Sequence, residues 1–415
     1  MRSIVVMMLA AVVPWLAATA PGLAASSDGQ AFEQIQKGQY LATAADCFSC
    51  HAQREGGKPF AAVRPIETPF GNITAPNITP DNETGIGAWT DDQFVRAVRE
   101  GVGRDDSRLY PAMPYTNYTK MSRDDVLAIL AYLKTIQPVH NAVRSNTLPF
   151  PFNIRAAMRV WDSLYFTPGD FKPDPKQSTV WNRGAFLVEG PGHCAACHTP
   201  KNFLGGDKTD ARLGGGKLQG WFAPDITGDT REGLGSWSEA EIATYLKTGH
   251  NGATAATGPM AEEVLNSTSK LNDADRMAMA TYLKSLPSHS DQAAPTPAGR
   301  QVMAAGQAIY HDECSACHGL EGKGTAQLFP ALAHSSIAQA SDPSTAIRLV
   351  LRGARSVATK DEPTAPGMPS FGWQLNDAQV AALLTYVGNT WNNAAVPVTA
   401  GQVKQARKSL STRNE

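Results

Sequence analysis

The chain has 415 residues, of which 42% are hydrophobic and 18% are charged, and its formal net charge is −1. This length suffices for about three domains of ordinary size. The 37 Lys and Arg residues nearly balance the 38 Asp and Glu residues, so the chain lacks the basic surplus that marks nucleic-acid binding. The composition therefore argues against a nucleic-acid partner and fits a loop-rich globular protein.

The N-terminus has the features of a secretory signal peptide. An apolar run over Ile4–Ala18 follows Arg2, and small residues suited to cleavage end at Ala24-Ala25. An uncleaved anchor is the weaker interpretation, because the run is short for a membrane span and contains Pro14. We therefore expect residues 1–25 to be a signal peptide and the mature chain to be exported to the periplasm.

All six cysteines fall in three copies of the pattern Cys-x-x-Cys-His. The pattern is typical of covalent c-type haem attachment, in which two thiols hold the haem and the adjacent histidine ligates the iron. A redox dithiol, half of a zinc site or coincidence could explain one copy, but three copies favour haem. Zinc fits least, because a closed structural site needs four ligands and each copy supplies only three. The predicted attachment residues are Cys47, Cys50, Cys194, Cys197, Cys314 and Cys317, and the predicted proximal iron ligands are His51, His198 and His318.

The sequence that follows the first haem motif is repeated after the second. Ala75-Pro76-Asn77-Ile78-Thr79 recurs as Ala223-Pro224-Asp225-Ile226-Thr227, at an offset of 148 residues. Gly85-Ile86-Gly87-Ala88-Trp89 recurs as Gly233-Leu234-Gly235-Ser236-Trp237 at the same offset. So long a period indicates duplicated domains rather than a solenoid. The third block is shorter and more diverged, but it keeps the order of the elements.

Each block is expected to begin and end with a helix. A glycine ahead of the haem motif allows another helix to approach the backbone closely; these glycines are Gly38, Gly184 and Gly306. The last helix of each block starts at a capping residue with a polar partner three positions on, and a tyrosine follows ten positions after the cap. The three caps are Ser122, Asn272 and Asn376, and the tyrosines are Tyr132, Tyr282 and Tyr386.

One loop methionine in each block is a candidate for the sixth iron ligand, the position that methionine takes in many cytochromes c. These residues are Met113, Met260 and Met368. The interval from the proximal histidine to the methionine is 62 residues in the first two blocks and 50 in the third. A buried methionine is more often a core residue than a ligand, but the repeated spacing favours ligation. Of the other histidines, only His250 and His334 are placed where distal ligation is conceivable.

The segments between the blocks differ in character. Residues 141–177 include the apolar run Leu148-Pro149-Phe150-Pro151-Phe152-Asn153-Ile154-Arg155, which either joins the first two domains or offers a docking surface to a partner subunit or a membrane. Residues 289–298 have the composition of a linker. The predicted division is signal peptide 1–25, domain 28–140, connector 141–177, domain 178–288, linker 289–298, domain 299–395 and polar tail 396–415.

A first helix with a glycine at its crossing point, packed on a last helix that carries an aromatic, resembles the class I cytochrome c domain. The resemblance covers all three blocks and implies an all-α fold of three tandem domains with irregular connecting loops. The order of the blocks, the connector and the segment Asn77-Ile78-Thr79-Pro80-Asp81 resemble the tri-haem cytochrome c subunits of membrane-bound, quinone-linked periplasmic dehydrogenases. Those enzymes oxidise alcohols, gluconate, sorbitol, fructose or aldehydes.

This resemblance implies three covalently bound haem c groups. It also implies a relay of electrons from a large dehydrogenase subunit, of flavin, PQQ or molybdenum type, to ubiquinone at the outer face of the cytoplasmic membrane. A small third subunit and contact with the membrane surface are further expectations. The polar tail departs from relatives with an apolar C-terminal segment and argues against self-anchoring.

The sequence holds no recognisable substrate site. No nucleophile–base pair, dinucleotide fingerprint or phosphate loop stands out, so we expect the chain to transfer electrons rather than to oxidise a substrate itself. Two alternatives stay open. The chain could be a free periplasmic multihaem shuttle, or it could be a haem enzyme with one open iron, such as a peroxidase.

Overall fold

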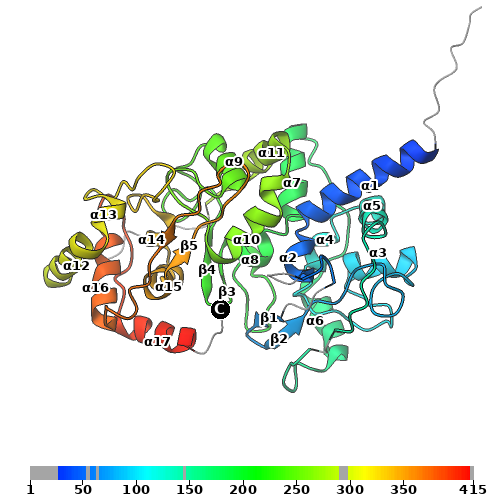
Figure 1. Cartoon of the computed structure of the whole chain (residues 1–415), viewed down its shortest axis with the longest axis horizontal. Coiled ribbons are helices and arrows are strands. Elements are labelled where there is room, and N and C mark those ends of the chain that lie inside the picture. The colour runs from blue at the N-terminus through cyan, green and yellow to red at the C-terminus, as the bar shows by residue number, and fades with distance from the viewer. Residues whose placement is uncertain (1–26, 53–56, 62–64, 144–145, 289–297, 412–415) are drawn as a thin grey trace, which may run out of the picture.

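The computed structural model describes residues 27–52, 57–61, 65–143, 146–288 and 298–411 (Figure 1). The expected signal peptide and almost all of the expected linker lie outside these residues. The described chain forms three helical units that follow one another in chain order across the molecule, from the N-terminal unit in blue and cyan to the C-terminal unit in orange and red.

The first unit comprises α1 (Ser27–Ala44), α2 (Cys47–His51), β1 (Pro65–Thr68), β2 (Gly71–Thr74), α3 (Asp91–Glu100), α4 (Tyr115–Tyr118) and α5 (Arg123–Leu133). A connecting segment follows, with a 3-10 turn η1 (Arg155–Ala157) and α6 (Met158–Tyr165). The second unit comprises α7 (Thr179–Glu189), α8 (Ala195–His198), η2 (Thr209–Ala211), β3 (Gly214–Leu218), β4 (Trp221–Asp225), α9 (Glu239–Thr248), α10 (Gly258–Asn266), η3 (Thr268–Lys270) and α11 (Asp273–Lys284).

The third unit has the same plan with fewer residues. It comprises α12 (Arg300–Glu313), α13 (Ser315–His318), α14 (Ser336–Gln339), α15 (Ser344–Arg352), β5 (Ala354–Arg355), β6 (Gly367–Met368), α16 (Asp377–Val387) and α17 (Ala400–Ser411).

Each unit is built on a crossing of two helices at a glycine. Helix α1 packs on α5, α7 on α11 and α12 on α16. A Cβ atom would lie 1.8 Å from a carbonyl oxygen of the facing helix at Gly38 and at Gly184, and 2.2 Å from one at Gly306. No side chain fits at such distances, so the predicted close approach at all three glycines is confirmed.

The predicted caps of the last helices are also present. Ser122 accepts a hydrogen bond from the backbone of Asp125, whose side chain accepts from the backbone of Ser122 in return. Asn376 begins α16 with the same reciprocal pair of bonds. Asn272 caps α11 at its N-terminus through one such bond. These local signals fix where each last helix starts.

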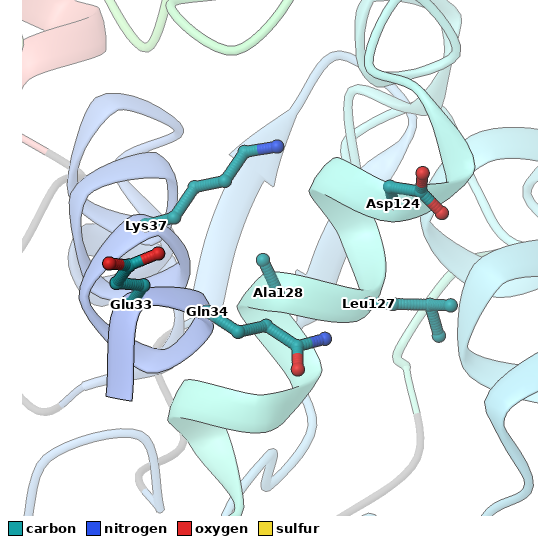
Figure 2. Close-up of a pocket in the computed structure, with 6 residues that line it drawn as sticks. All are labelled: Glu33, Gln34, Lys37, Asp124, Leu127 and Ala128. Carbon is teal, nitrogen blue, oxygen red and sulfur yellow. The ribbon is translucent and has the colours of Figure 1, made fainter. Parts of the chain in front are cut away.

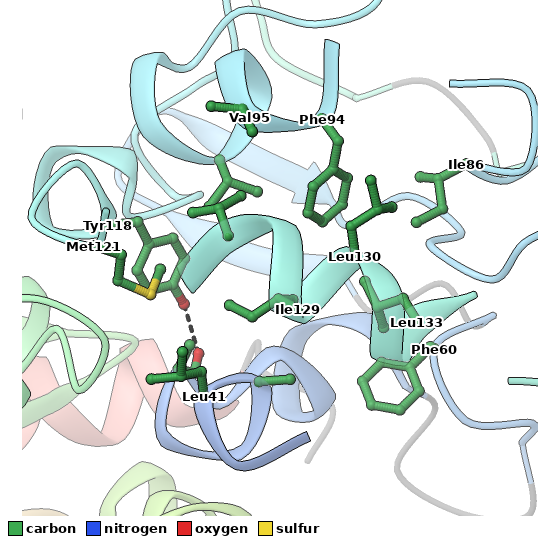
Figure 3. Close-up of a cluster of buried hydrophobic side chains, with 14 residues drawn as sticks. Leu41, Phe60, Ile86, Phe94, Val95, Tyr118, Met121, Ile129, Leu130 and Leu133 are labelled. Atoms are coloured by element: carbon green, nitrogen blue, oxygen red, sulfur yellow. Dashed lines mark hydrogen bonds between the residues drawn. The ribbon is translucent and has the colours of Figure 1, made fainter. Parts of the chain in front are cut away.

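Each unit has its own hydrophobic core. Figure 3 shows the first, in which Leu130 of α5 lies on the side of Phe94 of α3, whereas Ile129 of α5 lies on the side of α1. The second and third cores gather around α11 and α16 in the same way, and the predicted tyrosines Tyr282 and Tyr386 lie within them.

Three short antiparallel pairs of strands correct the expectation of an all-α chain. Strand β1 pairs with β2, β3 with β4, and β5 with β6. The β3–β4 pair turns at Gln219-Gly220, where φ is 47° and 75°, a left-handed conformation that favours glycine. Strands of two to five residues are too short to show the alternation of apolar and polar residues that would reveal them in the sequence.

The connecting segment contacts both the first and the second unit. The buried carboxylate of Asp162 on α6 accepts a hydrogen bond from the Tyr115 hydroxyl at 2.6 Å and lies 3.2 Å from the Arg108 guanidinium. On the other side, the indole N–H of Trp161 donates to the Leu204 carbonyl at 2.9 Å. The segment therefore holds the two units together, as one of the two sequence interpretations proposed.

The outer face of this segment is apolar and exposed. Phe150, Val160 and Leu164 have 79%, 64% and 62% of their surface exposed, and Phe203 of the second unit has 85%. No helix of the described residues combines the length and the apolar character that a membrane span requires.

The third unit joins the second through β4 and α15. The Thr345 hydroxyl accepts from the Phe222 amide at 2.8 Å and donates to its carbonyl at 2.9 Å. The Arg348 guanidinium stacks over the Trp221 ring at 4.4 Å. These contacts fix α15 against the hairpin of the second unit.

The end of the chain differs from the expected polar tail. It forms α17, whose Val403 and Leu410 are buried in the core of the third unit. Arg407 donates to the Asp377 carboxylate at the start of α16, at 2.8 Å. Polar residues on the other faces of α17 explain why composition alone did not reveal a docked helix.

Three candidate haem centres

The Cys-x-x-Cys-His motif forms one helical turn in each unit, directly after the first helix. These turns are α2, α8 and α13. Residues three apart on a helix lie on the same side, so the two thiols of each motif face one way. All six cysteines lie outside any disulfide and are partly exposed, as thioether attachment requires.

Each predicted proximal histidine forms the same kind of hydrogen bond. In each unit the ring Nδ1 lies within hydrogen-bond distance of a proline carbonyl, at 2.7 Å, 2.7 Å and 2.9 Å. A carbonyl only accepts, so Nδ1 carries the proton and Nε2 has a free lone pair for a metal ion. The pairs are His51 with Pro76, His198 with Pro224 and His318 with Pro330.

Burial favours the ligand form of these rings. It lowers the pKa of His51, His198 and His318, so the imidazoles are neutral at physiological pH, as iron ligation requires. Burial also raises the pKa of the Cys47 thiol to about 12 and that of Cys197 to about 11.

Each predicted methionine packs against the same core as the haem motif of its own unit. Met113 lies in the first core with Cys47, Met260 in the second with Cys194, and Met368 in the third with Cys314. Met113 is in a loop before α4, as expected. Met260 lies in the first turn of α10, and Met368 lies in β6; both elements were expected to be loops.

The other methionines and histidines that were considered as distal ligands differ in their burial. Met121 and Met279 are fully buried core residues. His334 is exposed, whereas His250 is buried and its Nε2 has no hydrogen-bond partner among the described residues.

The sequence did not predict the three proline carbonyls that accept these hydrogen bonds. Pro76 and Pro224 lie in the repeated segments Ala75–Thr79 and Ala223–Thr227, so the repeat contained the signal. Pro330 has no such repeated context in the shorter third block. Its role emerges only from the fold.

Two surface depressions of the described residues lie away from these centres. Figure 2 shows one between α1 and α5, lined by Glu33, Gln34, Lys37, Asp124, Leu127 and Ala128. A second lies along α12 and is lined by Ala308, Ile309, His311 and Asp312. Neither includes a motif cysteine, a proximal histidine or a candidate methionine.

The cytochrome c family model matches residues 35–137, 182–287 and 303–391. The chain belongs to the cytochrome c family. Each matched stretch contains one pair of cysteines, one proximal histidine and one of the three methionines. Family membership implies covalent haem c, and the three cysteine pairs are consistent with three haems.

Close relatives are cytochrome subunits of dehydrogenases. The chain is 39% identical over 396 residues to the gluconate 2-dehydrogenase cytochrome c subunit of Pantoea cypripedii, covering 90% of this chain and 89% of that protein. It is 37% identical over 402 residues to the fructose dehydrogenase cytochrome subunit of Gluconobacter japonicus, covering 90% and 82%. It is 34% identical over 393 residues to the alcohol dehydrogenase (quinone) cytochrome c subunit of Gluconacetobacter polyoxogenes, covering 90% and 84%.

The residues fit the haem group that the family implies. The thiols of each motif lie one turn apart, and the neutral histidine has its metal-binding nitrogen free. A thioether side chain of the same core is available as second axial ligand. These similarities support a role in electron transfer as a subunit of a dehydrogenase complex.

Proposed function

We propose that this protein is a tri-haem cytochrome c that relays electrons from a dehydrogenase subunit to ubiquinone in the periplasm. The observation that carries the proposal is the threefold recurrence of the same arrangement: a cysteine pair, a histidine held by a proline carbonyl, and a methionine in the same core. Similarity to dehydrogenase cytochrome subunits over 90% of the chain supports it.

The protein's own residues would hold and orient each haem. Cys47 and Cys50, Cys194 and Cys197, and Cys314 and Cys317 would form the thioether bonds. His51, His198 and His318 would ligate the iron on one side, and Met113, Met260 and Met368 on the other. When bound, each haem supplies one-electron exchange between ferric and ferrous iron. With histidine and methionine both bound, no coordination position would remain open for substrate chemistry.

The proposed division of labour in the complex rests on the similarity to cytochrome subunits of dehydrogenases. A large subunit with a flavin, PQQ or molybdenum cofactor would oxidise an alcohol, polyol, sugar acid or aldehyde. A small third subunit would complete the complex at the outer face of the cytoplasmic membrane. We also propose that residues 1–25 are removed on export and that the cytochrome domains span 28–140, 178–288 and 299–395.

Four measurements test this function. Intact mass of the exported chain should equal the sequence from residue 26 plus three haems, and the haem should resist acid-acetone extraction. Purification from membranes should bring down a large dehydrogenase subunit, and the complex should reduce a ubiquinone analogue when the substrate of that subunit is added. Fewer than three attached haems would overturn the tri-haem assignment.

The two alternatives predict other results. A free shuttle would be recovered without a dehydrogenase subunit. A haem enzyme with an open iron would bind carbon monoxide at one ferrous haem without displacing a ligand, whereas three His/Met-ligated haems should not bind it readily.

A further inference from the structure

The segments that lead into the haem motifs of the first and second units meet at Tyr118. The carbonyl of Ala45, two residues before Cys47, accepts a hydrogen bond from the Tyr118 hydroxyl at 2.6 Å (Figure 3). The Tyr118 ring also meets the ring of His193, the residue before Cys194, edge to face, with their centroids 5.6 Å apart. Tyr118 therefore contacts the entry to one haem motif and the entry to the other.

Helix α10 forms a second contact with the first motif. The Asn266 amide donates to the Ser49 hydroxyl at 2.8 Å, and Ser49 lies between the two cysteines of α2. The same hydroxyl donates to the buried Asp46 carboxyl at 2.7 Å. Helix α10 begins with the turn that holds Met260, the predicted distal ligand of haem 2. The contact therefore connects the attachment turn of haem 1 with the helix that carries this ligand.

Two carboxyl groups lie beside the first attachment turn. Asp46 directly precedes Cys47, and Glu263 lies on α10, the helix that contacts α2. Burial raises the pKa of both carboxyl groups.

The third haem motif has different neighbours. Turn α13 packs on α12 of its own unit, and the Tyr310 hydroxyl of α12 donates to the carbonyl of Gly319, directly after the motif, at 2.5 Å. The third unit meets the second through β4, α15 and the cluster of Val357 with Ala256 and Val264. In Figure 1, α13 lies toward the left end of the molecule, whereas α2 lies near its middle, close to α10.

We propose that the contact of Ala45, Tyr118 and His193 brings the attachment sites of haems 1 and 2 together, so that these two haems would form a close pair and exchange electrons directly. The inference rests on the proposed attachment of three haems. The thioether bonds would hold each haem against its own motif, so two motifs whose entry segments touch would place the two haems near one another. The exchange would be of one electron: one iron would go from ferrous to ferric and the other from ferric to ferrous, with no bond formed or broken.

The first test is electron paramagnetic resonance of the fully oxidised protein, which detects magnetic interaction between neighbouring ferric haems. The double variant Cys314→Ala/Cys317→Ala, which lacks haem 3, should keep the interaction. The variant Cys47→Ala/Cys50→Ala, which lacks haem 1, should lose it. Loss of the interaction with haem 3 instead of haem 1 would overturn the proposal.

The second test leaves all three haems in place and so does not depend on the folding of haem-deficient variants. Asn266→Asp puts a negative charge at the contact with little change in shape. A nearby negative charge favours ferric iron over ferrous iron, so spectroelectrochemical titration should show that the reduction potentials of haems 1 and 2 both fall and that of haem 3 does not. Asn153→Asp, in the exposed connecting segment, is the matched control and should leave all three potentials unchanged.

A shift of one potential alone, or of the haem 3 potential, would contradict a shared contact. The test also separates this inference from the proposed function. A chain with three haems that accepts electrons from its partner but shows no interaction between haems 1 and 2 would preserve the function and remove the pair. A chain with fewer haems would remove both.

Discussion

Tyr40 and Asp275 lie 235 positions apart in the chain, and the Tyr40 hydroxyl donates to the Asp275 carboxylate at 2.6 Å. Arg183 donates to the same carboxylate from Nε at 2.8 Å and from Nη2 at 2.7 Å. This carboxylate therefore links α1 of the first unit to α7 and α11 of the second. Burial alone would raise the pKa of Asp275, but the hydrogen bonds from Arg183 and Tyr40 outweigh it and hold the pKa below its ordinary value.

Asp275→Asn should destabilise the folded protein at neutral pH by about 2 kcal/mol, because hydrogen bonds to a charged group are lost. A carboxyl group whose pKa is lowered by folding contributes its full stabilisation above its unfolded pKa of about 4. That contribution disappears as the pH falls through the lower, folded-state pKa. Urea unfolding should therefore show a large difference between wild type and variant at pH 7 and a much smaller one in acid. The exposed Asp210→Asn is the control, and a difference that does not change with pH would contradict the assignment.

Gly184→Ala should destabilise the second unit by about 2 kcal/mol or more, because an added methyl group overpacks a helix crossing. The new Cβ would lie 1.8 Å from the Ala278 carbonyl oxygen, so the two helices must move apart. Thermal unfolding followed by circular dichroism measures the effect. Gly299→Ala has nothing within 4 Å of the new methyl group and should leave the midpoint unchanged. Equal midpoints for the two variants would show that the crossing tolerates a side chain.

Met260→Ala should remove the sixth ligand of haem 2. Ferric haem with methionine ligation has a weak absorption band at the red end of the spectrum, and three such haems contribute to it, so the band should fall by about one third. Met279→Leu replaces a buried methionine of the same core and should leave the band intact. An unchanged band in Met260→Ala would exclude this residue as ligand.

Asp162→Ala should loosen the connecting segment. It leaves the Tyr115 hydroxyl and the Arg108 guanidinium without the carboxylate that they share, at a cost of about 2 kcal/mol. Limited proteolysis should then cut the chain near α6 faster than in the wild type. Ser163→Ala changes an exposed neighbour and should not alter the rate. If both variants are cut at the wild-type rate, Asp162 does not hold the segment in place.

The sequence revealed those parts of the fold that local chemistry controls. The crossings at Gly38, Gly184 and Gly306 followed from the absence of a side chain, and the helix starts at Ser122 and Asn376 followed from cap residues. The strands β1 to β6 were missed because they are too short for a detectable pattern, and helix α17 because its polar faces dominate its composition.

The candidate haem centres, like the fold, were predicted from the sequence only in part. The cysteines and histidines were found from contiguous motifs, and the three methionines were narrowed down by spacing, with their ligation still to be tested. Pro330 was missed because a backbone carbonyl accepts hydrogen bonds whatever its side chain, so residue identity says little about it. The contact between the first two motifs was not foreseeable, because Tyr118 and His193 meet only when two folded units dock.

The acceptor that orients each proximal imidazole is a main-chain oxygen, at nearly the same distance in all three units. Point substitution cannot delete such an atom, so this feature survives divergence that alters everything around it. In the proposed tri-haem arrangement, it would give the three rings a similar electron-donating strength toward iron. Any spread in redox potential along that relay would then come from the opposite axial side, from local charges and from solvent access, and those are the properties that an engineer would have to change.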